Sequence, residues 1–412
     1  SACLVGSEMC IRDRVVPAAL RRQWRDELRG WAPELSVMPV HGRPEDRAWQ
    51  WRAPAHVHLV SYDTLRFDLS EHLDSPQAPP WDLVVLDEAQ RIKNARTATA
   101  WVCKKLRRSR QWALTGTPLE NRTDDLKSIL AFVLPETSQP GHAFAGHVAL
   151  KADLRRVQLR RRKADVLPEL PPKLVSRLTI PLRPAQRRTY DRAQRDGIVE
   201  LKARGESIRV EHVLALIARL KQICNFCPAT SDSSKMDDLR DRVSVLISEG
   251  HKALIFSQFT NPDYGARRIA LELGNRALVY AGDLAEGQRQ EVLAAFRSSP
   301  DPRVLILSVR AGGLGLNLQD ASYVVHFDSW WNPASRWQAE ARSHRMGQRW
   351  PVNVYSYTCE GTIEERIEEI LDEKQELFQE FVDGVSLDVS RILSRQELFG
   401  LFGLKPPPPT SR

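Results

Sequence analysis

One short apolar run constrains the fold more than any other part of the sequence. Residues 83–86 read Leu-Val-Val-Leu without a polar interruption, and Asp87 and Glu88 follow directly. A short unbroken apolar run is typical of a parallel β-strand that is covered on both faces. The sequence therefore predicts an α/β fold in which residues 83–86 form a buried strand of a parallel sheet.

The two carboxylates after this run suggest a chemical role. Open α/β sheets bind their ligands at the carboxyl ends of the strands, which is where Asp87 and Glu88 lie. Asp87 is placed to hold Mg²⁺, as an aspartate does at the end of a strand in phosphate-loop NTPases. Glu88 is placed to orient or deprotonate an attacking water. A bare Asp-Glu pair is more often a solvated acidic turn, so this interpretation depends on the rest of the chain.

Longer motifs support the chemical interpretation. Residues 87–94, Asp-Glu-Ala-Gln-Arg-Ile-Lys-Asn, resemble motif II of the Swi/Snf-type helicase-like ATPases, a branch of superfamily two. Residues 312–318, Gly-Gly-Leu-Gly-Leu-Asn-Leu, and residues 338–348, Gln-Ala-Glu-Ala-Arg-Ser-His-Arg-Met-Gly-Gln, are similar to later motifs of that family. The motifs occur in the family's order, from about residue 15 to about residue 400.

The resemblance implies an architecture and an activity. It implies two RecA-like parallel-sheet lobes, the first incomplete, with a helical insertion between them and a C-terminal bracing helix. ATP and Mg²⁺ would bind in the cleft between the lobes. Hydrolysis would drive movement along duplex DNA and remodel protein–DNA complexes, including nucleoprotein or transcription complexes, without strand separation. The protein is expected to be a monomer.

The motifs also suggest domain boundaries. The expected segments are a non-native read-through segment at 1–14, RecA-like lobe 1 at 15–125, a helical insertion and inter-lobe linker at 126–235, RecA-like lobe 2 at 236–358, and a C-terminal brace with a disordered tail at 359–412.

Two arginines in the last motif are expected to complete the catalytic site. Arg342 and Arg345 are three residues apart in a predicted helix, so they would share one face. Two guanidinium groups opposite a nucleotide are suited to stabilise the transition state of phosphoryl transfer, an effect worth about 10³–10⁵ in rate. Asp87, Glu88, Arg342 and Arg345 are therefore the expected catalytic residues, and Asp87 is the expected metal ligand.

The resemblance assigns further residues to binding. The expected nucleotide-binding residues are Gln90, Thr117, Gly313, Gly315 and Gln338. The expected nucleic-acid-binding residues are Ser61, Thr64, Arg160, Arg161, Lys163, Ser257, Asn317 and Trp331. Residues 155–163 hold six basic residues in nine, which favours phosphate contacts but also fits a solvated basic face. The Ser-Tyr-Asp-Thr sequence at 61–64 is more often a helix cap than a DNA contact.

One motif of the family is missing. The phosphate-binding loop G-x-x-x-x-G-K-[ST] precedes the other motifs in the family, but no Gly-Lys dipeptide occurs in this sequence. Residues 5–14 look like translated sequencing-adapter read-through, so the chain is expected to be an N-terminally truncated enzyme that is inactive alone. The alternative is a nucleic-acid-binding module that hydrolyses nothing.

Composition excludes other classes of protein. Hydrophobic residues make up 42% and charged residues 27% of the sequence, as in ordinary globular proteins. The net charge of +8 permits a polyanionic partner without proving one. No apolar run approaches the roughly 18 residues of a membrane span.

Of the six cysteines, Cys224 and Cys227 form a C-x-x-C motif that lacks the second ligand pair of a zinc site. The protein is expected in the cytoplasm, associated with the nucleoid if it is bacterial.

Overall fold

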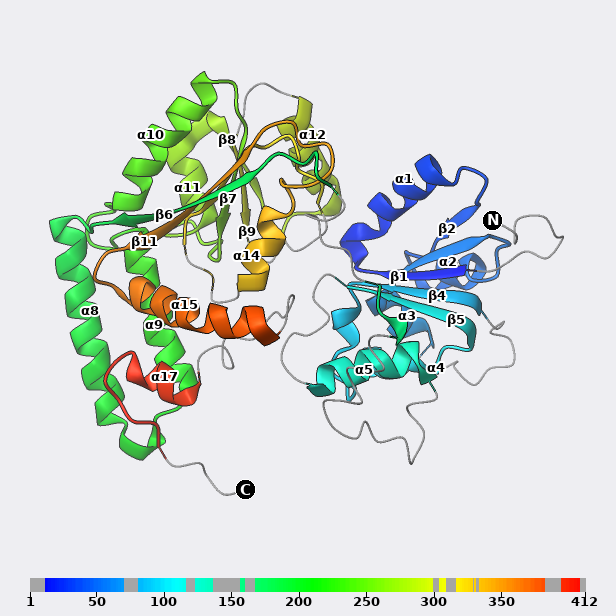
Figure 1. Ribbon diagram of the computed structural model, residues 1–412, viewed down its shortest axis with the longest axis horizontal. Helices are drawn as coiled ribbons and strands as arrows, with labels where there is room; N and C mark the ends of the chain where they lie inside the picture. The colour runs from blue at the N-terminus through cyan, green and yellow to red at the C-terminus, as the bar shows by residue number, and fades with distance from the viewer. Residues whose placement is uncertain are drawn as a thin grey trace. The chain divides into compact units, whose positions relative to one another are not determined.

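The computed structural model divides the chain into two compact units (Figure 1). Unit 1 comprises residues 1–161 and 384–386, and unit 2 comprises residues 162–383 and 387–412. The structure describes residues 12–69, 81–115, 123–135, 156–159, 167–298, 304–308, 316–328, 330, 333–381 and 394–407. Each unit is described by itself below.

Unit 1 is built on a five-stranded parallel sheet with the strand order β2-β3-β1-β4-β5. The strands are β1 (Arg12–Val16), β2 (Val37–Pro39), β3 (Val57–Ser61), β4 (Trp81–Asp87) and β5 (Arg108–Leu114). The apolar run at 83–86 lies in β4, where Val84 and Leu86 are completely buried. The parallel α/β sheet expected from this run is confirmed.

The first strand begins earlier than the sequence suggested. The backbone of β1 pairs from Arg12 onward with β3 and β4, so the strand starts within the segment that was expected to be foreign to the fold. Strand pairing uses backbone groups that every residue carries. The side-chain pattern on which the boundary at residue 15 depended therefore could not locate the start of the strand.

Helices cover the sheet of unit 1 on two faces. They are η1 (Ala18–Leu20), α1 (Arg21–Trp31), α2 (Pro44–Gln50), α3 (Tyr62–Leu69), η2 (Ala89–Ile92), α4 (Ala98–Lys105) and α5 (Thr123–Val133). α4 and α5 lie on the opposite side of the sheet from α1 (Figure 1). Val84 and Leu86 of β4 belong to the larger core under α3, α4 and α5, whereas Trp24 of α1 packs on a small cluster with Val16 and Leu59.

The strand β5 forms one edge of this sheet. Its alternate residues Arg110, Trp112 and Leu114 are exposed, with 57% of the surface of Trp112 accessible. Alternate residues of a strand point to the same face. One face of β5 therefore exposes an aromatic and an aliphatic side chain. Leu114, the last residue of the strand, pairs in register with Asp87 of β4.

Unit 2 contains a six-stranded parallel sheet with the order β6-β11-β10-β7-β9-β8. The strands are β6 (Lys173–Ile180), β7 (Ala253–Ser257), β8 (Ala277–Tyr280), β9 (Val304–Ser308), β10 (Tyr323–His326) and β11 (Val352–Cys359). β6 lies within residues 126–235, which were expected to be helical. It is an edge strand with mostly exposed residues, so no buried apolar run marked it, and its pairing with the distant β11 has no local signal.

The helices of unit 2 are α8 (Pro184–Ala203), η4 (Gly205–Ser207), α9 (Val210–Asn225), α10 (Ser234–Ser248), α11 (Ala266–Leu273), η5 (Gly274–Arg276), α12 (Glu286–Ser298), α14 (Pro333–Glu340), α15 (Ile363–Phe381) and α17 (Arg395–Gly400). Some of them cover its sheet, and others, among them α8, α9, α15 and α17, form a second core beside it. The apolar side of α9 is buried against α8, α15 and α17 (Figure 1). None of the described helices has the length and hydropathy that crossing a membrane requires.

A completely buried ion pair joins α10 to α15 in unit 2. Lys235 Nζ donates to Glu364 Oε1 over 2.8 Å and to Asn225 Oδ1 over 3.2 Å. The backbone N–H of Cys359 donates to the other carboxylate oxygen of Glu364 over 3.0 Å. Burial alone would lower the pKa of Lys235, but Glu364, Cys359 and Cys224 together outweigh it and hold that pKa above its usual value. Lys235 is therefore charged, and its ion-pair partner is Glu364.

We expect Lys235→Met to lower the free energy of unfolding of unit 2 by about 3–5 kcal/mol, because it leaves the charge of Glu364 buried without a partner. The control is Arg267→Met, whose partner Asp283 is 61% exposed and whose own side chain is 47% exposed. Removing such a surface pair costs less than about 1 kcal/mol. Urea unfolding followed by circular dichroism measures both values, and equal losses would contradict the assignment.

Candidate functional site

The two carboxylates of unit 1 are held by contacts at the carboxyl end of β4. Asp87 Oδ1 accepts from the N–H of Glu88 over 2.9 Å, and Asp87 Oδ2 accepts from Trp24 Nε1 of α1 over 2.7 Å. The Tyr62 hydroxyl donates to the backbone carbonyl of Asp87 over 2.7 Å. Burial raises the pKa of Tyr62, so this hydroxyl stays a donor. Each carboxylate oxygen of Asp87 accepts one hydrogen bond and keeps a lone pair for a cation.

Glu88 has a strained backbone. Its φ of 51° and ψ of 52° place it in the left-handed region, which residues other than glycine seldom adopt. Such a conformation costs on the order of 1–3 kcal/mol and occurs preferentially at functional sites. The strain ends β4 abruptly and starts η2 one residue later. It therefore fixes where the Glu88 carboxylate lies relative to that of Asp87.

A chain of hydrogen bonds connects Glu88 to the end of the neighbouring strand. Gln90 Nε2 donates to Glu88 Oε2, and Thr115 Oγ1 donates to Gln90 Oε1 over 2.8 Å. Thr115 follows β5 directly. The amide of Gln90, expected to bind nucleotide, thus links the ends of β4 and β5. The predicted nucleotide-binding residue of this segment was Thr117, two residues later, and Thr115 makes the contact among the described residues.

The predicted DNA contact at Ser61 is not supported. The Ser61 side chain is buried, and its hydroxyl donates to Thr64 Oγ1 over 2.8 Å and accepts from the N–H of Thr64 over 3.1 Å. These bonds close the first turn of α3. The capping interpretation of this sequence is therefore correct for Ser61, while a DNA contact by the partly exposed Thr64 stays a prediction.

The two arginines of unit 2 do not share a helical face. α14 ends at Glu340, whose carbonyl accepts from the N–H groups of Ser343 and His344 over 3.1 and 3.0 Å. Arg342 and Arg345 follow in a series of tight turns, so the expectation of one helix was wrong. The helical spacing continues beyond α14 in the sequence, but backbone hydrogen bonds of the surrounding loop end the helix. The Arg342 side chain is buried, and that of Arg345 is partly exposed.

The segment from Arg342 to Gln348, called the arginine turn below, is fastened to the loop before β10. Gln348 Nε2 donates to the carbonyls of Gln319 and Ala321 over 2.9 and 2.8 Å. The Ser343 hydroxyl also donates to the carbonyl of Ala321. The backbone N–H of Leu318 donates to the carbonyl of Arg342 over 3.0 Å. Gln348 therefore positions the arginine turn, a role that the sequence did not reveal.

The predicted DNA contact at Ser257 is also not supported. Ser257 is completely buried at the end of β7, and its hydroxyl donates to Asp328 Oδ2. Asp328 accepts further hydrogen bonds from Asn225 Nδ2 over 3.0 Å and from the N–H of Gln258 over 2.8 Å. Ser257 therefore belongs to a buried network around Asp328.

Three buried polar atoms of unit 2 have no hydrogen-bond partner among the described residues. They are Asn317 Oδ1, Gln319 Oε1 and Gln258 Nε2. Buried polar groups are satisfied in the large majority of cases, so unpaired ones are open to an ordered water or a ligand. Asn317 therefore remains a candidate for binding. Gln338 of α14 is partly exposed.

Seven predicted site residues fall outside the described part of the chain. They are Thr117, Arg160, Arg161, Lys163, Gly313, Gly315 and Trp331.

A second group of side chains has the composition of a metal site, but its thiol and carboxylate groups are not in the state that metal binding requires. Ligand atoms of Cys224, Cys359 and Glu364 lie within 4.8 Å of one another. Burial raises the pKa of the Cys359 thiol well above its usual value, and Lys235 already neutralises Glu364. Thiols bind metals as thiolates, so this cluster favours a protonated thiol packed beside an ion pair.

Comparison with known proteins identifies the family. The model of the SNF2-related domain matches residues 14–228, and the model of the helicase conserved C-terminal domain matches residues 234–347. The chain belongs to the SNF2-related family. The expected resemblance to the Swi/Snf-type ATPases is thereby confirmed.

Two curated relatives illustrate the range of the family. An uncharacterized ATP-dependent helicase of Mycoplasma genitalium is 31% identical over 405 residues, which cover 94% of this chain and 39% of the relative. The human SWI/SNF-related matrix-associated actin-dependent regulator of chromatin subfamily A member 1 is 29% identical over 417 residues, which cover 93% of this chain and 39% of the relative. The chain therefore spans about two fifths of the length of these relatives.

Solved structures of an archaeal relative are also similar. The Sulfolobus solfataricus SWI2/SNF2 ATPase core domain is 28% identical with a TM-score of 0.47, over 96% of this chain and 85% of that one. The same core in complex with dsDNA is 27% identical with a TM-score of 0.42, over 91% of this chain and 83% of that one.

We expect Trp24→Phe to lower the free energy of unfolding of unit 1 by about 1.5–3 kcal/mol, because the Asp87 carboxylate loses a charge-assisted hydrogen bond. Trp31→Phe is the matched control. Trp31 Nε1 also donates to a carboxylate, that of Glu27, but Trp31 is 85% exposed. Its change should stay within about 0.5 kcal/mol. Urea unfolding of both variants measures the difference, and equal effects would show that the contact to Asp87 stabilises nothing.

Proposed function

We propose that this chain is the ATPase core of a duplex-DNA translocase that remodels protein–DNA complexes. The observation that carries the proposal is the arrangement of Asp87 and Glu88 at the carboxyl end of β4, with Glu88 linked through Gln90 to Thr115. Open parallel sheets bind their ligands at this edge. The SNF2-related and helicase C-terminal matches support an ATP-dependent activity.

Asp87 and Glu88 have different roles in this proposal. Bound ATP with Mg²⁺ supplies the phosphoryl group to be transferred to water. Asp87 faces the cation with the lone pairs that its contacts to Trp24 and Glu88 leave free. Glu88 orients the attacking water and accepts its proton. Its left-handed backbone and its bond to Gln90 hold the carboxylate in place before the nucleotide arrives.

The arginines of unit 2 contact a nucleotide phosphate in this proposal. Arg345 is partly exposed in a turn that Gln348 fastens to the preceding loop, so its guanidinium is accessible to a ligand. Arg342 contributes from the same turn. The unpaired Oδ1 of Asn317 supports a ligand beside the glycine-rich motif.

Duplex DNA is the proposed partner. The remaining candidates for its contacts are Thr64, Arg160, Arg161, Lys163, Asn317 and Trp331. The basic run at 155–163 and the net charge of +8 support contacts to phosphates. The relatives of this chain include an uncharacterized ATP-dependent helicase and a regulator of chromatin.

The second candidate is a binding module without turnover, and it applies to the chain as given. No Gly-Lys dipeptide occurs in these 412 residues, so the sequence offers no lysine of the phosphate-loop type for the β- and γ-phosphates.

We expect the 412-residue chain to release phosphate from ATP no faster than a buffer control, with or without duplex DNA. A longer form that supplies a G-x-x-x-x-G-K-[ST] loop should turn over at about one per second or faster, in the ordinary range of enzymes, and be stimulated by duplex DNA. Colorimetric phosphate release measures both. Turnover by the 412-residue chain would refute the need for the loop, and an inactive longer form would refute the ATPase assignment.

In the turnover-competent form, Arg345→Ala should lower kcat on the order of 10³-fold and leave KM nearly unchanged, because the guanidinium acts mainly on the transition state. Arg345→Lys should fail nearly as badly, since an ammonium lacks the two-pronged donor geometry. Arg349→Ala, an exposed arginine beyond the arginine turn, is the control and should keep full activity. Steady-state kinetics with saturating duplex DNA decide, and a rise in KM at constant kcat would make Arg345 a ground-state ligand.

A further inference from the structure

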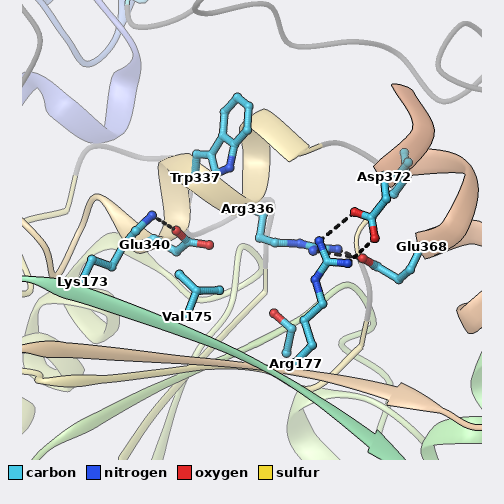
Figure 2. Close-up of a pocket in the computed structure, with 10 residues that line it drawn as sticks. Lys173, Val175, Arg177, Arg336, Trp337, Glu340, Glu368 and Asp372 are labelled. Atoms are coloured by element: carbon cyan, nitrogen blue, oxygen red, sulfur yellow. Dashed lines mark hydrogen bonds and ion pairs between the residues drawn. The ribbon is translucent and has the colours of Figure 1, made fainter. Parts of the chain in front are cut away.

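Residues 170–173, Leu-Pro-Pro-Lys, are fastened directly to the arginine turn. This segment, called the connector, leads into β6. His344 Nε2 donates to the carbonyl of Pro171 over 2.8 Å. Lys173 Nζ donates to Glu340 Oε2 over 2.6 Å, a contact visible in Figure 2. The proposed chemistry of the site uses neither contact.

Glu340 belongs to both the ion pair and the arginine turn. Its side chain is 5% exposed and pairs with Lys173, while its carbonyl accepts from the N–H groups of Ser343 and His344. One residue therefore joins the connector to the first hydrogen bonds of the turn. Displacing the Glu340 side chain moves the backbone that begins the turn.

Lys173 is the cation on which Glu340 depends. Burial would raise the pKa of Glu340, but His326 and Lys173 together hold it below its usual value, so the carboxylate is charged. His326 Nε2 lies 3.5 Å from Glu340 Oε1, yet burial lowers the pKa of His326 and keeps that ring neutral near pH 7. Arg336, on the same helix, pairs with Glu368 instead. Near neutral pH the charge of Glu340 is therefore balanced mainly by Lys173.

Two ion pairs connect α14 to its surroundings. Glu340, its last residue, pairs with Lys173 of β6, and Arg336, in the middle of the helix, pairs with Glu368 of α15 over 2.6 Å. Beside these pairs is a cavity of about 300 Å³, and Val175 and Trp337 are among the residues that line it (Figure 2). Ala339 of α14 packs in the core of the sheet, so the ion pairs act together with apolar packing in placing the helix.

We propose that Lys173 and Glu340 are positioning residues, through which the connector determines the position of the arginine turn. A displacement of the connector is transmitted through the Lys173–Glu340 pair and the His344–Pro171 bond to the backbone that carries Arg342 and Arg345. The structural link stands on the contacts alone, whereas its effect on hydrolysis rests on the proposed function.

The first test measures the structural link in the 412-residue chain by hydrogen–deuterium exchange. In Lys173→Met, amides of peptides covering residues 341–348 should exchange about tenfold faster or more, because local opening becomes easier once Glu340 has lost its partner. Amides of β7 and β10 should keep their rates. Glu340→Gln, which keeps the shape and removes the charge, should show the same local effect, and Lys173→Arg should retain slow exchange.

The matched control is Arg177→Met on the same strand. Arg177 pairs with Asp372 of α15, and these side chains are 48% and 44% exposed. Its loss should change exchange in the arginine turn by less than about twofold. Unchanged exchange in Lys173→Met overturns the proposal. Equal acceleration in β7 and β10 also overturns it, because that pattern means only that unit 2 is less stable.

The second test uses the turnover-competent form. Lys173→Met should lower kcat about tenfold with little change in KM, while Lys173→Arg and Arg177→Met stay near the unaltered rate. If Lys173→Met speeds exchange in the arginine turn but leaves kcat unchanged, the proposed effect on hydrolysis is overturned. The link between the connector and the arginine turn then still holds. Absence of ATPase activity in the unaltered longer form refutes the proposed function, and the exchange experiment still decides on the link.

Discussion

The burial of parallel strands on both faces determines where this protein can place polar chemistry. Strands such as β4, β7 and β9 carry apolar residues along most of their length, so functional groups are confined to the strand ends. Asp87 and Glu88 follow one strand end, and Thr115 follows the next. The hydrogen bonds from Glu88 through Gln90 to Thr115 are possible because neighbouring parallel strands end at the same edge of the sheet.

The site of unit 1 is organised before any ligand is present. Asp87 is fixed by an indole from α1 and by the N–H of Glu88, and Glu88 has a backbone conformation that local sequence disfavours. The free energy needed to maintain this conformation comes from the surrounding core, in which Val84 and Leu86 are fully buried. A carboxylate that is already in place requires little reorganisation during reaction.

Unit 2 places buried charges at the joints between its helices and its sheet. Lys235–Glu364 joins α10 to α15, Asp328 accepts from Asn225 of α9 and from the end of β7, and Lys173–Glu340 joins β6 to α14. Burying an ion pair offers little net stability over apolar packing, but breaking one is strongly destabilising. Such pairs therefore specify one arrangement of elements. The cavity beside α14 is lined by two of them, Lys173–Glu340 and Arg336–Glu368.

The sequence by itself determined the parallel α/β class, the family and the residues of the carboxylate motif, because apolar runs and long motifs are local properties of the chain. Tertiary structure alone decided the rest. β6 and the start of β1 depend on pairing with distant strands, and the hydrogen bond of Ser257 is to Asp328, 71 residues away. In the arginine turn, backbone and side-chain hydrogen bonds to the loop at 318–321 take the place of a continued helix. Contacts between residues far apart in the chain leave no periodic pattern in it, so only the folded structure shows them.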